Sequence, residues 1–166
     1  YATSLYEREN YTINNFRQYL SENVQYIFYF HTKGVSHKEG VYQERRKILN
    51  YYILEHYKLC LEFLEKYDVV GCSLYQYPQL HFSGNFWWTK KSYLDTLPLQ
   101  INQNYLTPEM FIGYTSKKNP LYVSLSQRTN HDSLFFHKKR TREIIKKNIS
   151  SYPFQNHWNK NLIKYT

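Results

Sequence analysis

Four residues that follow a short aromatic run could bind a phosphate group. His31, Thr32, Lys33 and Gly34 come directly after residues 26–30, which we predict to be a buried strand. Open α/β sheets bind their ligands at the carboxyl ends of such strands. Lys33 could neutralise a diphosphate, and Gly34 would let the backbone approach it closely. His31 and Thr32 could hydrogen-bond the same group. The alternative is an ordinary solvated turn.

A second group of residues could bind a sugar. It comprises His81, Ser83, Gly84, Asn85, Phe86, Trp87 and Trp88. The C–H face of a sugar ring stacks on indole rings, and its hydroxyls pair with amide and imidazole groups. The alternative is a core strand in which Phe86 and Trp88 pack inward while Asn85 caps a turn. Both interpretations can hold together, because alternation along a strand directs Asn85 and Trp87 to the opposite face.

Glu109 is a candidate general base. It follows Pro108 at the start of a predicted helix over 108–113, beside apolar residues, and a carboxylate there could activate a hydroxyl nucleophile. The alternative is a carboxylate that only complements the positive end of the helix. Asp95 and Asp68 are weaker candidates for the base.

Several familiar motifs are absent from the sequence. It contains no P-loop, dinucleotide fingerprint, HExxH, CxxC or Gly-x-Ser-x-Gly. It also lacks an Asp-x-Asp pair, the usual seat of a nucleotide-sugar's divalent metal, so the sequence assigns no cofactor, and a requirement for Mn²⁺ or Mg²⁺ stays open. Cys60 and Cys72 both lie in apolar surroundings, which predicts buried free thiols.

The composition fits one globular domain. The chain has 166 residues, of which 42% are hydrophobic and 21% charged, and this argues against disorder and fibrous repeats. No stretch of 18 apolar residues and no signal peptide is visible, so we expect a cytoplasmic protein, which could also associate peripherally with a membrane. The chain starts at Tyr1 rather than at Met, so we expect it to be a fragment or a processed form.

The positive charge lies at one end of the chain. The net charge is +9, and residues 117–166, with 11 basic and 2 acidic side chains, carry all of it. The densest cluster, within 138–147, could attract phosphates, acidic glycans or an anionic membrane surface. The alternative is a solvated helix face. We therefore divide the chain into a core over 1–116 and a basic extension over 117–166 that packs on the same domain.

The elements needed to position these residues alternate between helices and strands. We predict helices over 12–20 (with Thr12 as N-cap), 41–66, 90–97, 108–113 and 136–149, and strands over 26–30, 67–72 and 122–126, the last at a sheet edge. This alternation is typical of an α/β layer structure.

Taken in order, these segments resemble a group of bacterial and large-virus glycosyltransferases. The matching pieces are Glu9-Asn10, the YFHTKG segment over 29–34, Arg46, YDVVG over 67–71, HFSGNFWW over 81–88, Leu97-Pro98 and Pro108-Glu109. They span residues 6–113, about two thirds of the chain. Residues 9–34 are also similar to the rhamnan-synthesis glycosyltransferases. Where the family has a Trp-Arg pair, this chain has Arg45-Arg46.

The resemblance implies a GT-A-like sheet with flanking helices that lacks the N-terminal part of the fold. It also implies a nucleotide-sugar donor and a glycan or glycoprotein acceptor. Lys33 would stabilise the leaving diphosphate in place of a metal, and Glu109 would be the catalytic base. The remaining donor- or substrate-binding residues would be His31, Thr32, Gly34, Arg46, His81, Ser83, Gly84, Asn85, Trp87 and Trp88.

The sequence is compatible with three functions. The first is sugar transfer from a nucleotide-sugar. The second is a non-catalytic glycan-binding or assembly module derived from such an enzyme. The third is nucleic-acid binding, which ranks last because the aromatic residues and the positive charge occupy different parts of the chain, whereas single-strand binders interleave them.

Overall fold

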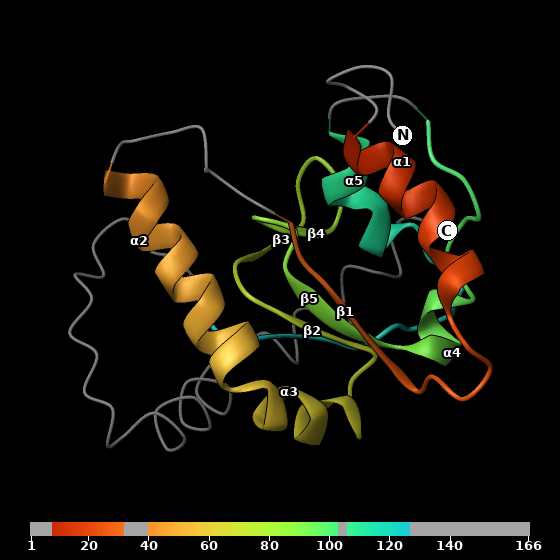
Figure 1. The fold of residues 1–166 in the computed structure, drawn as a ribbon, viewed down its shortest axis with the longest axis horizontal. Helices are drawn as coiled ribbons and strands as arrows, with labels where there is room; N and C mark the ends of the chain where they lie inside the picture. The colour runs from red at the N-terminus through yellow and green to blue at the C-terminus, as the bar shows by residue number, and fades with distance from the viewer. Residues whose placement is uncertain (1–7, 32–39, 103–105, 127–166) are drawn as a thin grey trace.

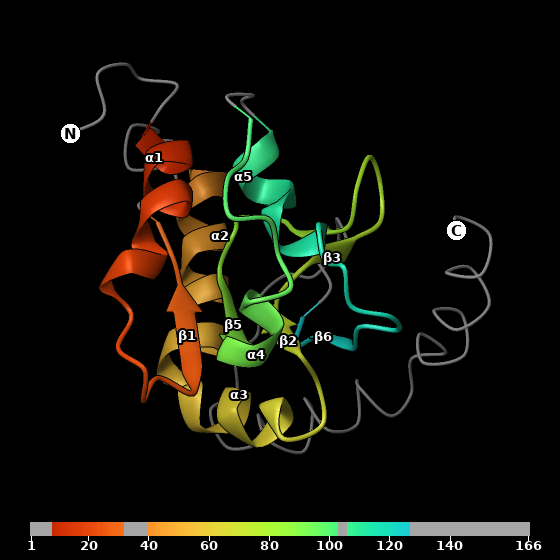
Figure 2. The same ribbon diagram turned by 90° about the vertical axis from the view of Figure 1, so that its right-hand side faces the viewer.

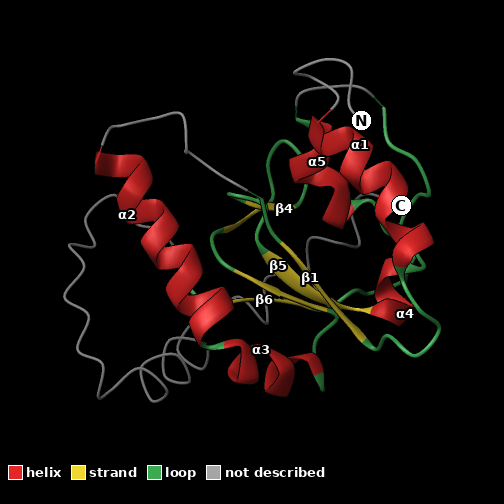
Figure 3. Cartoon of the chain, viewed as in Figure 1, coloured by secondary structure: helices red, strands yellow, loops and turns green. Residues whose placement is uncertain are grey.

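A mixed four-stranded sheet lies between two layers of helices in the computed structural model, which describes residues 8–31, 40–102 and 106–126 (Figures 1 and 3). In chain order the elements are α1 (Arg8–Asn15), η1 (Phe16–Tyr19), β1 (Tyr26–Tyr29), α2 (Gly40–Leu49), η2 (Asn50–Glu55), α3 (Tyr57–Leu64), β2 (Val69–Gly71), β3 (Leu74–Tyr75), β4 (His81–Phe82), β5 (Trp87–Lys90), α4 (Lys91–Leu94), α5 (Thr107–Met110), η3 (Phe111–Gly113) and β6 (Tyr122–Ser124). The fold is therefore mixed α/β, as the alternation of elements predicts.

Three of the four strands run in the same direction. The strand order is β1-β5-β2-β6, in which β5 is antiparallel to both β1 and β2, and β6 is parallel to β2. The carboxyl ends of β1, β2 and β6 therefore share one edge of the sheet with the beginning of β5. In Figure 2 the arrow of β1 points toward α1, while α3 lies at the opposite end of the sheet. We call this shared edge the carboxyl edge.

Each face of the sheet has its own apolar core. Helices α1 and α4 and the segment η3 contribute Ile13, Tyr93 and Phe111 to the core that buries Trp87. On the other face, α2, η2 and α3 cover Phe86 and Trp88 (Figure 1). The predicted alternation along β5 is confirmed, since Trp87 faces one core while its two neighbours face the other.

The helical stretch predicted over 41–66 is confirmed over most of its length, but it is not one continuous α-helix, because the chain forms α2, the π-helical turn η2 and α3. The break falls at His56, whose φ of −102° and ψ of 32° are not helical. Two side chains reach one carbonyl of the π turn: the Trp88 indole of β5 donates to the Ile53 oxygen at 2.8 Å, and the Cys60 thiol of α3 lies 3.9 Å from the same oxygen. Side chains that insert into a helical ladder in this way locally widen it.

Two predicted helix ends also need correction. Helix α1 begins at Arg8, so Thr12 lies inside it and is not an N-cap. The helix predicted over 90–97 is only α4, Lys91–Leu94, followed by turns. The predicted basic helix over 136–149 lies outside the described residues.

The described part of the basic extension belongs to the same unit as the core. Strand β6 pairs with β2 at the sheet edge, as predicted. Lys117 Nζ lies 2.6 Å from Asp68 Oδ1, at the start of β2. Strand β6 is thus part of the sheet itself, and Lys117 is paired with the residue that precedes β2.

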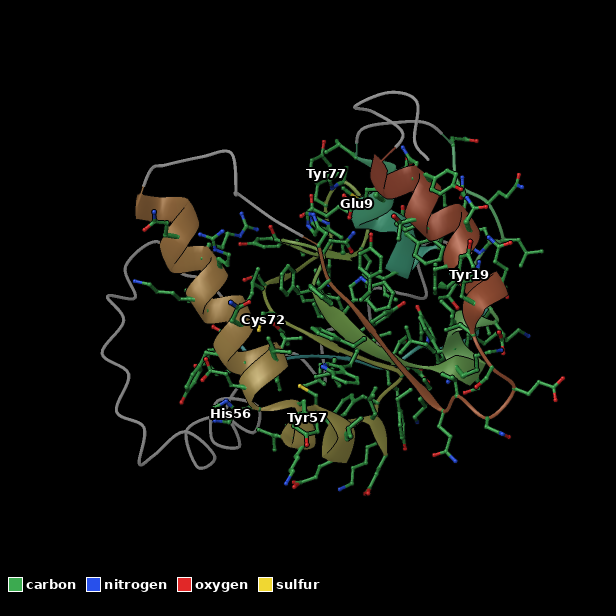
Figure 4. All side chains as sticks on the ribbon, viewed as in Figure 1. Glu9, Tyr19, His56, Tyr57, Cys72 and Tyr77 are labelled. Atoms are coloured by element: carbon green, nitrogen blue, oxygen red, sulfur yellow. The ribbon has the colours of Figure 1, made fainter. Side chains whose placement is uncertain are left out.

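Both cysteines are buried free thiols, as predicted. Burial raises the pKa of the Cys60 thiol to about 12 and holds the pKa of Cys72 well above its ordinary value. Figure 4 shows Cys72 between α2 and the sheet. Within the ranges that the structure describes, no helix has the length and apolar character that crossing a bilayer requires.

Candidate functional site

A tight turn at the carboxyl edge organises the candidate site. Ser83, Gly84 and Asn85 precede β5, and the last two have φ angles of 99° and 54°. At such a φ glycine is unstrained and asparagine is among the better-tolerated side chains. A Cβ on Gly84 would also lie 2.8 Å from Leu49 Cδ1 of α2. The sequence Gly-Asn therefore makes possible a turn that packs directly against α2.

Asn85 joins the turn to three other parts of the chain. Its Nδ2 donates to Glu9 Oε1 at 2.5 Å and to the Pro108 carbonyl at 3.1 Å, and its Oδ1 accepts from Trp87 Nε1 at 2.7 Å. Only 2% of Asn85 is exposed. Its side chain thus holds α1, α5 and β5 together while satisfying a buried indole N–H.

Glu9 points from α1 into this network (Figure 4). Its Oε1 accepts from Asn85 and also from the Tyr29 hydroxyl at 3.2 Å, and its Oε2 lies 4.0 Å from His31 Nδ1. Burial first, and then the Glu9 carboxylate, raise the pKa of Tyr29 far above its ordinary value, so the hydroxyl stays a donor. The Glu9 and His31 side chains are 29% and 28% exposed, so solvent and ligands can reach them.

His31 is tied to the turn by its other nitrogen. Its Nε2 lies 3.0 Å from the Gly84 carbonyl oxygen. A carbonyl oxygen only accepts, so Nε2 carries a proton and the neutral ring has its lone pair on Nδ1. The nitrogen that can exchange a proton is therefore the one that faces Glu9.

A second carboxylate and a guanidinium reach the same turn. Glu109 Oε1, from α5, accepts from the Gly84 backbone N–H at 2.7 Å. From α2, the Arg45 guanidinium donates to the Ser83 hydroxyl. Two carboxylates, an imidazole and a guanidinium thus surround three residues of backbone, an arrangement that can bind a polar ligand and transfer a proton.

The three aromatic site candidates are less accessible than the sequence suggests. Trp87 has no exposed surface, so in this conformation its ring positions Asn85 and is closed to stacking on a sugar. Trp88 is half-buried, stacked on Phe28 at 4.8 Å between ring centroids and bonded to the Ile53 carbonyl. His81 is 8% exposed, and its Nδ1 donates to the Gln79 backbone carbonyl within its own hairpin.

Two sets of candidates remain. Thr32, Lys33 and Gly34 lie outside the described residues. The contact with Ser83 comes from Arg45 and not from Arg46, the residue that matches the family pattern; Arg46 is half-buried.

The weaker acidic candidates lie away from the site. Asp68 sits at the amino end of β2, where it accepts from Lys117 and from the Leu121 backbone N–H, and it is 4% exposed. Asp95 follows α4 and forms an exposed ion pair with Lys91 at 2.7 Å. Both carboxylates have structural partners at the edge of the sheet opposite the turn.

Comparison with known proteins adds a family but no activity. A family model described as "Domain of unknown function (DUF8361)" matches residues 3–149. The chain belongs to this family. No curated protein and no solved structure matches it.

In this DUF8361 chain, sequence reasoning missed Glu9 and Arg45 as site residues. In the sequence, Glu9 stands out only as part of the Glu9-Asn10 segment of the family resemblance, and the resemblance assigns no role to this residue. The sequence does not distinguish Arg45 from Arg46, because two adjacent arginines on a helix point in different directions and only packing decides which one faces the turn.

The described residues of the DUF8361 chain do not form a metal site by themselves. Among residues 8–31, 40–102 and 106–126, no three histidine, cysteine or acidic side chains gather closely enough to hold an ion.

Proposed function

We propose that the protein is a glycosyltransferase that moves a sugar from a nucleotide-sugar donor to a glycan or glycoprotein acceptor. The main support is one contact, the 3.0 Å pair of His31 Nε2 and the Gly84 oxygen. It joins the HTKG and GNFWW segments, on which the family resemblance depends, although 53 residues separate the two partners. His31 and the Gly84 turn both lie at the carboxyl edge, where open α/β sheets bind ligands.

We also propose a GT-A-like arrangement for the sheet. The sheet has helices on both faces, and three of its strands share one direction, which supports this arrangement. The end of the strand that leads into HTKG also meets the GNFWW turn at one edge. The donor diphosphate would then lie near residues 31–34, where Lys33 would stabilise the charge that develops as the bond to phosphate breaks. The Asn85 and Ser83 turn would border the sugar.

A non-catalytic glycan-binding module is the second candidate. The observation that favours it concerns Glu109, the base expected from the sequence. Its Oε1 already accepts from the Gly84 N–H at 2.7 Å, which gives this carboxylate a structural use. The buried Trp87 ring likewise has a structural use.

Donor turnover separates the two candidates. The protein is incubated with a panel of UDP-, GDP-, CMP- and dTDP-sugars, with Mn²⁺ or with a chelator, and release of the nucleotide is measured. Transfer or hydrolysis of one donor supports the enzyme. Binding to a glycan array without any turnover supports the module.

Lys33→Ala tests the proposed cation. Removal of a preorganised charge at the leaving group should lower kcat by about 10²-fold or more. Lys58→Ala, an exposed lysine of α3, is the matched control and should leave kcat unchanged. Normal turnover by the Lys33 variant, or a strict requirement for metal, would remove this role from Lys33 and leave the transfer reaction itself standing.

A further inference from the structure

The Glu9 and His31 pair has a geometry that the proposed reaction can use. His31 directs Nδ1 toward Glu9 Oε2, since its Nε2 proton is held by the Gly84 carbonyl at 3.0 Å, and the imidazole side chain is 28% exposed. A lone pair on nitrogen and a carboxylate oxygen, 4.0 Å apart, are both acceptors. They become mutually favourable only when a proton is placed on the nitrogen.

The carboxylate is fixed in position for that event. Two donors, Asn85 Nδ2 at 2.5 Å and the Tyr29 hydroxyl at 3.2 Å, hold Oε1 of Glu9, which leaves Oε2 as the oxygen directed at the imidazole. Because these donors are neutral, Glu9 keeps its negative charge available to a neighbouring cation.

We propose that His31 Nδ1 accepts the proton of the acceptor hydroxyl during sugar transfer and that Glu9 stabilises the imidazolium that forms. This assignment rests on the proposed function. It makes His31 the catalytic base and Glu9 its positioning and charge-stabilising partner, in place of the base expected at Glu109. An imidazole with a carboxylate beside it is a well-established proton acceptor for hydroxyl nucleophiles.

The electron pairs and atoms of the step balance. The acceptor oxygen forms a bond to the anomeric carbon of the donor sugar, and its proton passes to His31 Nδ1. The bond from that carbon to the phosphate oxygen breaks, and its electron pair leaves with the nucleoside diphosphate. Solvent then removes the proton from Nδ1 and restores the neutral ring.

Two substitutions remove the base and its partner with little change of shape. His31→Gln can place its amide near the position of Nε2 and keep the bond to the Gly84 carbonyl, but it has no titratable nitrogen. Glu9→Gln keeps an oxygen that accepts from Asn85 and removes the charge. Glu22→Gln, at an exposed position before β1, is the matched control.

The probe reaction is hydrolysis of the donor that wild-type protein turns over, with water as the acceptor. Loss of general-base catalysis should lower kcat by about 10²- to 10⁴-fold for His31→Gln, with little change in KM. Glu9→Gln removes a unit negative charge that lies 4.0 Å from the imidazolium. The loss of this attraction should lower kcat by about 5- to 10³-fold.

Azide distinguishes the base from a merely structural role. Azide is already an anion and attacks the anomeric carbon without losing a proton, so both variants should form glycosyl azide at a rate within about threefold of the wild-type rate. A variant that loses hydrolysis and azide transfer to the same extent has lost positioning, and that result overturns the proposal. Near-ultraviolet circular dichroism verifies folding, and if Glu9→Gln does not fold, His31→Gln alone decides.

The two failures can be told apart. If wild-type protein turns over a donor and both variants hydrolyse it normally, the base assignment is wrong and the glycosyltransferase proposal survives. If wild-type protein turns over no donor, the proposed function is wrong, and the base assignment that rests on it is wrong as well.

Discussion

Replacing Asn85 by glycine should destabilise the fold by several kcal/mol, although glycine suits the local backbone better. The side chain is 2% exposed and forms bonds to Glu9 and to the Pro108 carbonyl, and it accepts one from Trp87. An indole N–H left buried without a partner costs about 1–3 kcal/mol, and each further bond contributes about 0.5–1.5 kcal/mol net. Glu9 can exchange its lost donor for water, so we take the low end there and expect about 3–4 kcal/mol in total.

The assay is urea denaturation followed by tryptophan fluorescence and far-ultraviolet circular dichroism. Asn119→Gly is the matched control, because Asn119 also has a positive φ, 53°, but is exposed. We expect its free energy of unfolding to stay within about 0.5 kcal/mol of wild type. Asn85→Ala should be worse than Asn85→Gly by about 1–2 kcal/mol, the cost of a left-handed backbone for alanine.

The comparison has a clear refuting result. If Asn85→Gly and Asn119→Gly unfold at the same urea concentration, the bonds of Asn85 carry no net stability and the turn is not the junction that we describe. If Asn85→Ala equals Asn85→Gly, the left-handed conformation is not imposed by the fold.

Three further predictions concern the rest of the molecule. Gly71→Ala should destabilise by about 1–3 kcal/mol in a thermal melt, because the new methyl group would lie 2.4 Å from Cδ1 of the Phe82 ring; a melt equal to wild type would show that the ring can move aside. Cys60 and Cys72 should not react with a thiol reagent at pH 8 in the folded protein and should react in urea, since burial raises both pKa values; rapid labelling of the native state would contradict the buried placement. Burial also raises the pKa of Tyr93 far above its ordinary value, so this group contributes stability below about pH 10, where the unfolded tyrosine stays protonated, and that stability should fall as the pH rises further. A free energy of unfolding that is flat from pH 9 to pH 11 would refute this last expectation.

Much of the fold can be predicted from local sequence patterns. The aromatic run over 26–30 and the apolar run over 67–72 predict the strands β1 and β2, and the sequence also predicts β6 at a sheet edge. Period-two alternation assigned Trp87 to one face and Trp88 to the other. These features depend on neighbours in the chain, so the sequence alone carries the information.

The break at His56 could not be predicted from the same patterns. Residues 41–66 contain no glycine or proline, and local propensity favours one helix. The π turn depends on donors such as the Trp88 indole, which approach from a strand 35 residues away. Contacts of this kind are decided by packing and not by propensity.

By itself, the sequence determined an α/β chain with a histidine after its first strand, a Gly-Asn turn before a tryptophan pair and two buried thiols. Only the tertiary structure decided that Glu9 holds Asn85 and faces His31, that Glu109 is bonded to the turn and that Arg45 and not Arg46 reaches it. The physical reason is that hydrogen-bond partners at the carboxyl edge come from α1, α2 and α5, and strand direction and helix packing, rather than spacing along the chain, bring those helices to one place.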